Sequence, residues 1–236
     1  MRKSGAISAF AMKQVLKAVK PGANLKTLDA IAEEAIVRKG AKPSFMTVPG
    51  YKWTTCLTIN EEVVHGIPRD IVLKEGDKLS IDLGAVYKGW HTDTAWSLMV
   101  GGSKSEFLDC GEKAMWDGIS KAVAGNTIGD ISNAIQTEIE SKGYSVVRTL
   151  VGHGVGRQLH EEPEVPGIGE RGMGLLLEKG VTLAIESIYA KGDHEVVLAN
   201  DGWTIVSKDG SLGGLFEMTV VVGDKKPKVL TDWRKV

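Results

Sequence analysis

The sequence has 236 residues, with 29 basic and 30 acidic side chains and a formal net charge of −1 at pH 7. A chain with so little net charge has no broad positive field, which argues against nucleic acid and against an anionic membrane as partners. The only two cysteines, Cys56 and Cys110, are too few for a disulfide framework or a structural zinc ribbon, and they suit a reducing compartment, the cytoplasm.

The first residues form an apolar segment that fits either a signal peptide or an amphipathic helix. Lys13 interrupts the apolar run, and Val15, Leu16 and Val19 continue it at helical spacing. We therefore predict an amphipathic first helix. No stretch approaches the roughly 20 apolar residues that a membrane span requires.

Two segments about 103 positions apart share one pattern. In each, apolar residues recur at three- and four-residue steps and a glycine ends the run, at Gly40 and at Gly143. Each pattern predicts a helix closed by a glycine in the left-handed conformation. The strands that follow also match, so that Asp82 of the first segment corresponds to Glu186 of the second.

Chance similarity of two helix-strand units is one explanation of this repeat, and a duplicated α+β half is the other. We favour duplication, with repeats at approximately residues 13–100 and 113–222 whose matching acids face one central cleft. No Pro-rich or Ser-rich linker separates the halves, and we expect the glycine pairs at 101–102 and 213–214 to be loop tips. The sequence thus predicts a single domain over residues 1–236.

Acidic residues stand on the non-core face of the predicted strands. The apolar neighbours of Asp82 alternate toward the core, so its carboxylate faces the other way. A turn pivoting at residues 87–88 would set Asp93 directly opposite Asp82, where like charges about 5 Å apart repel each other. An exposed hairpin with two solvated acids is the alternative. Glu186 and Glu217 repeat the pattern, however, and charges inside apolar strands are rare unless they are paired or bind metal.

A histidine in the glycine-rich segment 152–156 completes a candidate metal site, because its small neighbours leave the imidazole unobstructed. Together with four carboxylates it makes a set that suits two divalent cations and is too rich in oxygen for structural zinc. The predicted ligands are Asp82, Asp93, His153, Glu186 and Glu217. His65 and His160 lie outside this set, and their context fits either a role beside the ligands or a surface position.

These motifs resemble the pita-bread metallopeptidase family, and within it the type I methionine aminopeptidases, from about Lys13 to Val222. The matching segments are Ile59-Asn60-Glu61, His65-Gly66-Ile67-Pro68, Ile81-Asp82-Leu83-Gly84, His91-Thr92-Asp93-Thr94, Gly152-His153-Gly154-Val155-Gly156, His160-Glu161-Glu162-Pro163, Asp201-Gly202-Trp203-Thr204 and Glu217. The resemblance implies an α+β fold with pseudo-twofold duplicated halves, a central curved antiparallel sheet and outer helices. It also implies the same five metal ligands as the strand pattern.

The reaction implied by the resemblance is removal of the N-terminal methionine from nascent proteins and peptides. Two cations, chosen from manganese, iron, cobalt and zinc, would lower the pKa of a bridging water to give hydroxide near neutral pH, with Glu186 as proton shuttle. His65 would contact the substrate amide region, and His160 and a cation would stabilise the oxyanion. The substrate amine would dock near Asp82 and Asp93, which restricts cleavage to the first residue. Expected partners are N-termini of nascent polypeptides, with the ribosome as a candidate place of action, and the expected state is a monomer.

The predicted side-chain pocket departs from the family pattern. Three residues stand at the expected pocket positions: Tyr51, Cys56 and Trp203. Phe45, Val48 and Leu159 stand where the resemblance leads us to expect, respectively, a small residue, an aromatic residue and usually an aromatic residue. The pocket stays apolar, which suits the unbranched thioether of methionine. Its preference among Met, Leu and similar residues is open, because one methylene discriminates by only about 1–3 kcal/mol.

Ser187 and Met218 are two further departures, at positions where the family usually has proline and histidine. Neither removes a ligand, but both could alter strand rigidity or the surroundings of the ligands, and so metal affinity. Two alternatives to methionine removal stay open. One is an aminopeptidase of the same fold with a shifted first-residue or Xaa-Pro preference, and the other is a non-catalytic binding module. The intact ligand set and the near-neutral charge argue against the module.

Overall fold

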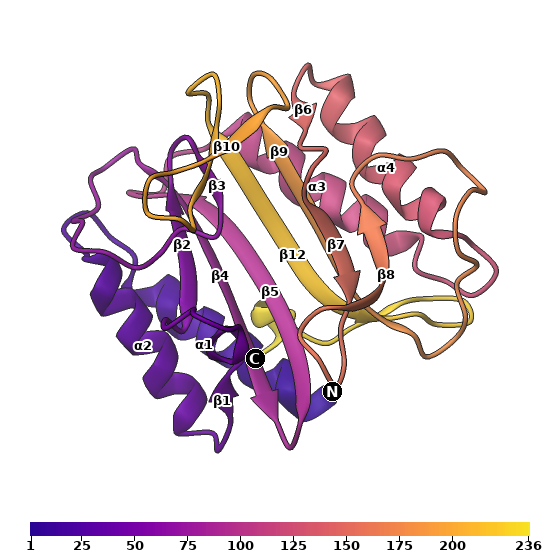
Figure 1. The fold of residues 1–236 in the computed structure, drawn as a ribbon, viewed down its shortest axis with the longest axis horizontal. Coiled ribbons are helices and arrows are strands. Elements are labelled where there is room, and N and C mark those ends of the chain that lie inside the picture. Colours follow the sequence, from indigo (N-terminus) through magenta and orange to yellow (C-terminus); the bar gives the residue numbers. More distant parts are fainter.

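A ten-stranded antiparallel sheet forms the centre of the computed structural model, which describes residues 1–236 (Figure 1). Its strand order is β1-β4-β5-β12-β9-β7-β8, with β2 beside β4, β6 beside β9 and β13 beside β12. The strands of this sheet are β1 Lys42–Pro43, β2 Thr55–Ile59, β4 Lys78–Tyr87, β5 Trp90–Met99, β6 Ser145–Val146, β7 Val151–Gly154, β8 Glu161–Pro166, β9 Thr182–Ala190, β12 Gly213–Val221 and β13 Lys228–Val229. A second sheet consists of β3 Glu62–Val64, β10 Val196–Leu198 and β11 Ile205–Ser207.

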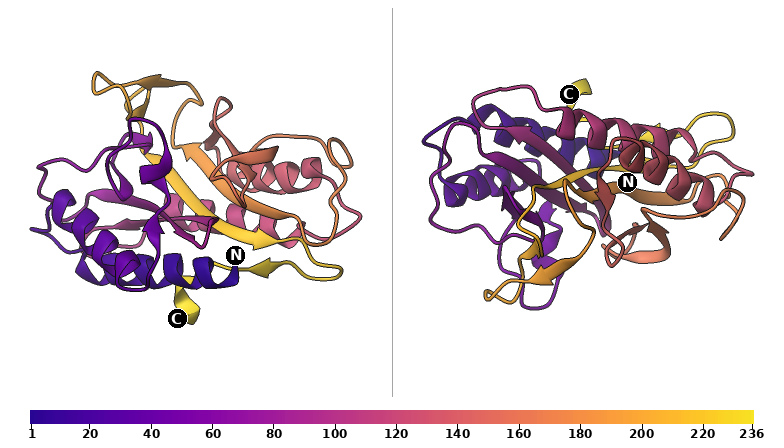
Figure 2. Two further views of the ribbon diagram at one scale, coloured as in Figure 1. Left: turned by 60° about the horizontal axis from the view of Figure 1, so that its bottom comes forward. Right: turned by 90° about the horizontal axis from the view of Figure 1, so that it is seen from above.

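The four α-helices lie on one side of the large sheet, and the small sheet lies on the other (Figure 2, right). The helices are α1 Arg2–Ala18, α2 Leu25–Val37, α3 Glu106–Ser120 and α4 Ile128–Ser141, and two short 3-10 helices span Phe45–Thr47 and Trp233–Lys235. The predicted amphipathic first helix is confirmed, since Ile7, Ala11, Met12 and Val15 are all buried at helical spacing. None of the helices combines the length and the apolar character that a membrane span requires.

The same backbone pairing occurs once in each half of the chain. Before α2, Asn24 forms an antiparallel bridge with Val72, and before α4, Thr127 forms the corresponding bridge with Leu176. The glycines that follow these two helices both have a positive φ, as predicted: Gly40 at 73° and Gly143 at 76°. One local design therefore appears on both flanks of the sheet, with α2 and α4 at opposite sides of Figure 1.

The hairpin of β4 and β5 has a different register from the one predicted. Its turn consists of Lys88 and Gly89, with φ of 52° and 73°, as in a two-residue type I′ turn. Asp93 therefore lies opposite Gly84 rather than opposite Asp82. The predicted pivot was one residue too early, so the prediction of two directly opposed aspartates was wrong. The two carboxylates are diagonal neighbours on the same face of the sheet.

The prediction of a loop tip at Gly213 and Gly214 was also wrong, because these glycines begin β12. They pair there with Ala190 and Tyr189 of β9. A Cβ on Gly214 would lie 2.4 Å from the Tyr189 ring, so the strand is free of side chains where that buried ring packs. Close packing, and not a turn, explains this glycine pair.

Lys78 begins β4 and is fully buried, on the same face as Ser80 and Asp82. Its Nζ donates hydrogen bonds to the main-chain carbonyl of Glu62 at 2.8 Å and to Ser80 Oγ at 3.2 Å. Burial lowers the pKa of Lys78 from 10.5 to about 7, although the carboxylates of Glu62 and Glu61 oppose this shift. The burial of this charged amine therefore lowers the free energy of unfolding at neutral pH.

We expect Lys78→Met to raise the free energy of unfolding at neutral pH and to flatten its pH dependence. Between the folded and unfolded pKa values the unfolded chain binds more protons, so the lysine makes stability rise with pH above about 7. Methionine removes this cost and also two hydrogen bonds, for a net gain of roughly 1–3 kcal/mol near pH 6 that shrinks toward pH 10.

Denaturant unfolding across that pH range measures the effect, and Lys179→Met is the matched control because this side chain is 68% exposed. A gain in stability that does not change with pH in Lys78→Met would contradict the burial of a titrating amine.

Candidate active site

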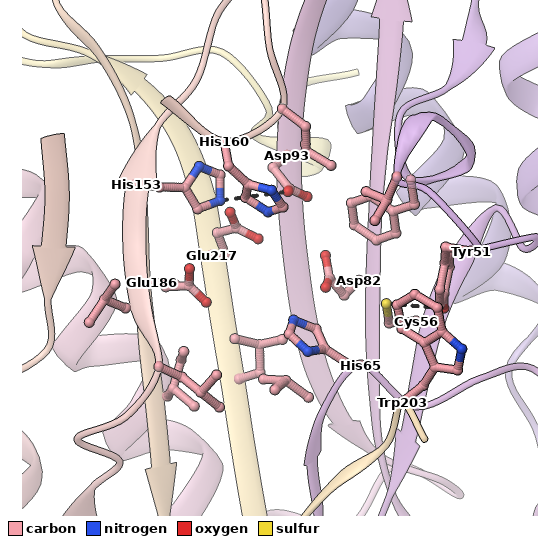
Figure 3. A pocket seen from close by; sticks show the side chains of 18 residues that line it. Tyr51, Cys56, His65, Asp82, Asp93, His153, His160, Glu186, Trp203 and Glu217 are labelled. Carbon is pink, nitrogen blue, oxygen red and sulfur yellow. Dashed lines mark hydrogen bonds and ion pairs between the residues drawn. The ribbon is translucent and has the colours of Figure 1, made fainter. Parts of the chain in front are cut away.

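One cavity is lined by every residue that the sequence predicted for the site (Figure 3). Because Leu79, Ile81, Phe216 and Met218 pack in the helix-covered core, their alternating neighbours face the opposite side of the sheet. Five elements supply the predicted ligands: Asp82 from β4, Asp93 from β5, His153 from β7, Glu186 from β9 and Glu217 from β12. The cavity therefore forms on the sheet face that the helices leave uncovered.

Five lining residues were not predicted: Val64, Leu150, Val151, Ile188 and Leu215. Two of them follow from strand alternation, because Ile188 lies two residues after Glu186 and Leu215 lies two residues before Glu217. They also pair with each other across β9 and β12. These two strands thus contribute an acid and an apolar side chain each to the same wall.

The four carboxylates stand close together without a basic side chain to balance them. Glu186 and Glu217 are direct cross-strand partners, and Asp82 and Asp93 are diagonal neighbours. No lysine or arginine lines the cavity. One oxygen each of Asp82 and Glu217 is buried without a hydrogen-bond partner. Such an arrangement is unstable unless protons or a cation neutralise it.

Burial raises the pKa of each of these carboxyl groups, and the charge of Asp93 raises the pKa further for Asp82, Glu186 and Glu217. The pKa of Asp93 itself rises to about 7, despite the hydrogen bond that the Thr94 N–H donates to it. The physical cause is desolvation of charges that have no positive partner. The cluster is therefore poised to accept positive charge.

His153 presents a neutral imidazole to this cluster. Burial lowers the pKa of His153 to about 4, and its Nδ1 lies 2.9 Å from the Gly154 carbonyl, to which it donates in the neutral tautomer. The lone pair of Nε2 then faces Asp93, whose Oδ2 is 4.0 Å away. Ligand atoms of Asp93, His153 and Glu217 all lie within 4.8 Å of one another. Two carboxylates and a neutral imidazole fit a divalent cation.

Two more histidines point into the cavity, as Figure 3 shows. The His160 ring packs edge-on against the His153 ring, with centroids 4.5 Å apart. His65 follows β3 with a φ of 58°, which is uncommon for a residue with a side chain. Burial lowers the pKa of both His65 and His160. Both are therefore neutral at pH 7, and each ring offers one N–H donor.

An apolar compartment adjoins the acidic cluster. Its buried residues are Phe45, Tyr51, Cys56 and Leu159, with Val48, Trp53, Ile67 and Trp203 packed against them. The Tyr51 ring meets the rings of Trp203 and Trp53 edge-on at 5.1 and 5.2 Å. Its hydroxyl donates to the Thr55 carbonyl at 2.7 Å, which fixes the ring in place. The lining of the compartment has the polarity that suits an apolar side chain.

The two remaining departures from the family pattern lie outside the cavity. The Ser187 hydroxyl donates to the Gly111 carbonyl on α3 at 2.9 Å. Met218 is fully buried in the helix-covered core, where the hydroxyls of Thr94 and Thr231 contact its sulfur. Neither side chain lines the cavity. An effect of either residue on metal affinity would therefore act through the strands.

The architecture agrees with comparisons to known proteins. Residues 1–224 match the model of metallopeptidase family M24. The chain belongs to metallopeptidase family M24. It is 42% identical over 234 residues to the methionine aminopeptidase of Clostridium perfringens, covering 98% of this chain and 94% of that one. It is 41% identical over 234 residues to methionine aminopeptidase 1 of Bacillus subtilis, with the same coverage.

Among solved structures, that of methionine aminopeptidase from Thermotoga maritima superimposes on this M24 chain with a TM-score of 0.95, at 40% identity. The match covers 98% of this chain and 94% of that one. The predicted α+β pita-bread fold and the resemblance inferred from the motifs are confirmed. Membership of a metallopeptidase family implies the use of a divalent metal ion, and such a cation would neutralise the unbalanced carboxylates.

Proposed function

We propose that this chain is a cytoplasmic metalloaminopeptidase that removes the N-terminal methionine from nascent polypeptides. The observation that carries the proposal is an unbalanced cluster of four carboxylates and neutral histidines directly beside an apolar compartment. The names of the relatives at about 40% identity support methionine as the first residue. Nucleic acid and membranes are not partners in this proposal, and the active unit is a monomer.

The proposed centre holds two divalent cations, of manganese, iron, cobalt or zinc. Their ligands would be Asp82, Asp93, His153, Glu186 and Glu217. Four carboxylates balance the charge of two such ions, and Asp93, His153 and Glu217 each have a ligand atom within 4.8 Å of those of the other two. When bound, the cations supply Lewis-acid chemistry, in that they lower the pKa of water and polarise a carbonyl group.

The side chains of the protein would position the substrate around this centre. The methionine side chain enters the apolar compartment, and the free amine lies toward the carboxylates of Asp82 and Asp93. The neutral ring of His65 contacts the first peptide amide. His160 donates an N–H hydrogen bond to the carbonyl oxygen as negative charge develops on it. A carboxylate oxygen of Glu186 takes the proton of the attacking water and delivers it to the leaving amine.

The decisive assay uses protein that is stripped of metal and reloaded singly with manganese, cobalt, iron or zinc. Its substrates are short peptides that differ only in residue one, with Met, Leu or Ala, together with Xaa-Pro peptides. An N-acetylated Met peptide is the matched control, because it keeps the side chain and lacks the free amine. We expect metal-dependent release of free methionine from the unblocked peptide alone.

Other outcomes separate the alternatives. Faster release of a different first residue, or cleavage of the Xaa-Pro peptides, would keep the chemistry and replace the specificity. An absence of release under every metal would contradict the proposal and favour the non-catalytic binding module.

We expect Leu159→Phe to sharpen the preference for Met over Leu at position one. The phenylalanine ring is larger than the leucine side chain and narrows a compartment whose wall includes Val48 and Leu159. The branched side chain of a substrate leucine tolerates this narrowing less well than the unbranched thioether of methionine. The expected change in the ratio of kcat/KM values is about tenfold. Leu176→Phe, at a residue that is 58% exposed, is the control. An unchanged ratio would place Leu159 outside the specificity-determining wall.

A further inference from the structure

Lys78 lies at one end of a buried hydrogen-bond chain that the proposed reaction does not use. Its Nζ donates to Ser80 Oγ at 3.2 Å, the hydroxyls of Ser80 and Ser97 are 2.7 Å apart, and Ser97 Oγ donates to the Leu215 carbonyl at 2.6 Å. The carbonyl can only accept, so the Ser97 hydrogen is committed to it and Ser80 must donate to Ser97. The direction of the chain is thereby fixed, from Lys78 to Leu215.

This hydrogen-bond chain spans a gap in the backbone pairing between β5 and β12. The ladder of β5 with β12 pairs Ala95 with Glu217 and Thr94 with Met218, and it does not extend to Leu215. There the Leu215 N–H donates to Ser97 Oγ at 3.2 Å, in place of a backbone carbonyl. One hydroxyl therefore serves both the N–H and the carbonyl of Leu215, a residue of the cavity wall two positions before a proposed metal ligand.

A second branch from the same amine reaches β3. Lys78 Nζ donates to the carbonyl of Glu62, the first residue of a strand that leads to Val64 and His65. Both of these residues line the cavity. The left-handed backbone of His65 costs free energy, so it persists only because the surrounding contacts hold it.

The amine has no carboxylate partner that would explain its burial. The Glu62 side chain is engaged in an ion pair with Arg69, and Lys78 makes no ion pair. A lysine buried without an ion pair is unfavourable for stability. Its contacts, in contrast, lead to two separate walls of the cavity.

We propose that Lys78 is a positioning residue of the active site, whose one amine fixes both the strand that leads to His65 and the strand that carries Glu217. It touches neither substrate nor metal. Its effect on turnover rests on the proposed function, whereas its effect on the two strands does not.

The test compares three full-length variants. Lys78→Met keeps the length of the side chain and removes the amine. Ser97→Ala removes only the branch to β12. Ile135→Val perturbs the fully buried packing of α4, a helix that belongs to neither branch. Amide hydrogen exchange is measured on metal-free protein for residues 60–66 and 213–217, and kcat and KM are measured with metal on a Met-first peptide.

We expect exchange in both segments to accelerate about tenfold in Lys78→Met, only in residues 213–217 in Ser97→Ala, and in neither segment in Ile135→Val. The value of kcat/KM should fall about tenfold in Lys78→Met, mainly through kcat, although this variant is at least as stable as the unsubstituted protein at neutral pH.

Unchanged exchange in both segments of Lys78→Met would overturn the proposal, and so would accelerated exchange combined with an unchanged kcat/KM. If the unsubstituted protein released no methionine, the proposed function would fail and the exchange measurement alone would decide whether Lys78 positions the two strands.

Discussion

Replacement of Asp93 by asparagine is expected to lower kcat by roughly a thousandfold or more, because it removes one charged ligand of the proposed metal centre. Asp93 is the acid whose charge raises the pKa of the other three carboxyl groups, and one of its oxygens lies within 4.8 Å of ligand atoms of both His153 and Glu217. Asparagine keeps the side-chain oxygen that accepts from the Thr94 N–H, so the strand should be retained. The loss should therefore be chemical rather than structural.

The measurement combines turnover of a Met-first peptide with the amount of metal that stays bound after desalting. We expect bound metal to fall together with kcat in Asp93→Asn. Asp224→Asn is the control, because this side chain is 62% exposed and pairs only with Lys179. Near-native turnover with a full complement of bound metal in Asp93→Asn would contradict the assignment of Asp93 as a ligand.

Strand periodicity was sufficient to predict that the acidic side chains of the central strands meet in the cavity. Alternation fixes the face of a side chain regardless of register, so Asp82, Glu186 and Glu217 were assigned to the correct face of the sheet. The register of the β4–β5 hairpin, in contrast, depends on the conformation of its turn, in which Lys88 adopts a positive φ together with Gly89. Lysine has no special preference for that conformation, so the sequence favoured a pivot one residue too early.

Other features depend on contacts between distant segments. Gly213 and Gly214 have the composition of a turn, but close packing explains them: a Cβ on Gly213 would meet Val63, and one on Gly214 would meet the ring of Tyr189. These contacts exist only once the distant strands have come together. Leu150, in the connection before β7, and Val64, at the end of β3 in the small sheet, reach the cavity through an arrangement that no local pattern specifies. The burial of Lys78 is likewise a tertiary effect, since the first residue of a strand is usually exposed enough for a lysine.

The second large effect concerns stability: a substitution that removes one charge from the acidic cluster should change the free energy of unfolding in opposite directions without and with metal. In metal-free protein, Glu217→Gln is expected to raise the free energy of unfolding by about 1–3 kcal/mol. Glu217 lies directly opposite Glu186, and one of its buried oxygens has no hydrogen-bond partner. An amide of the same shape removes a charge from this repulsive pair and supplies a donor to it.

With metal present, the unsubstituted protein should be more stable than Glu217→Gln. A ligand that binds only the folded state at a hundred times its dissociation constant stabilises it by about 2.7 kcal/mol, and Glu217→Gln should lose most of this gain because a charged ligand is missing. Thermal unfolding of both proteins, with chelator and with added manganese or cobalt, measures the crossing, and Glu178→Gln on the exposed surface serves as control. Destabilisation by Glu217→Gln in the presence of chelator would mean that the carboxylates already neutralise one another through shared protons. A crossing would mean instead that their repulsion is maintained in the metal-free fold and is relieved when a cation binds.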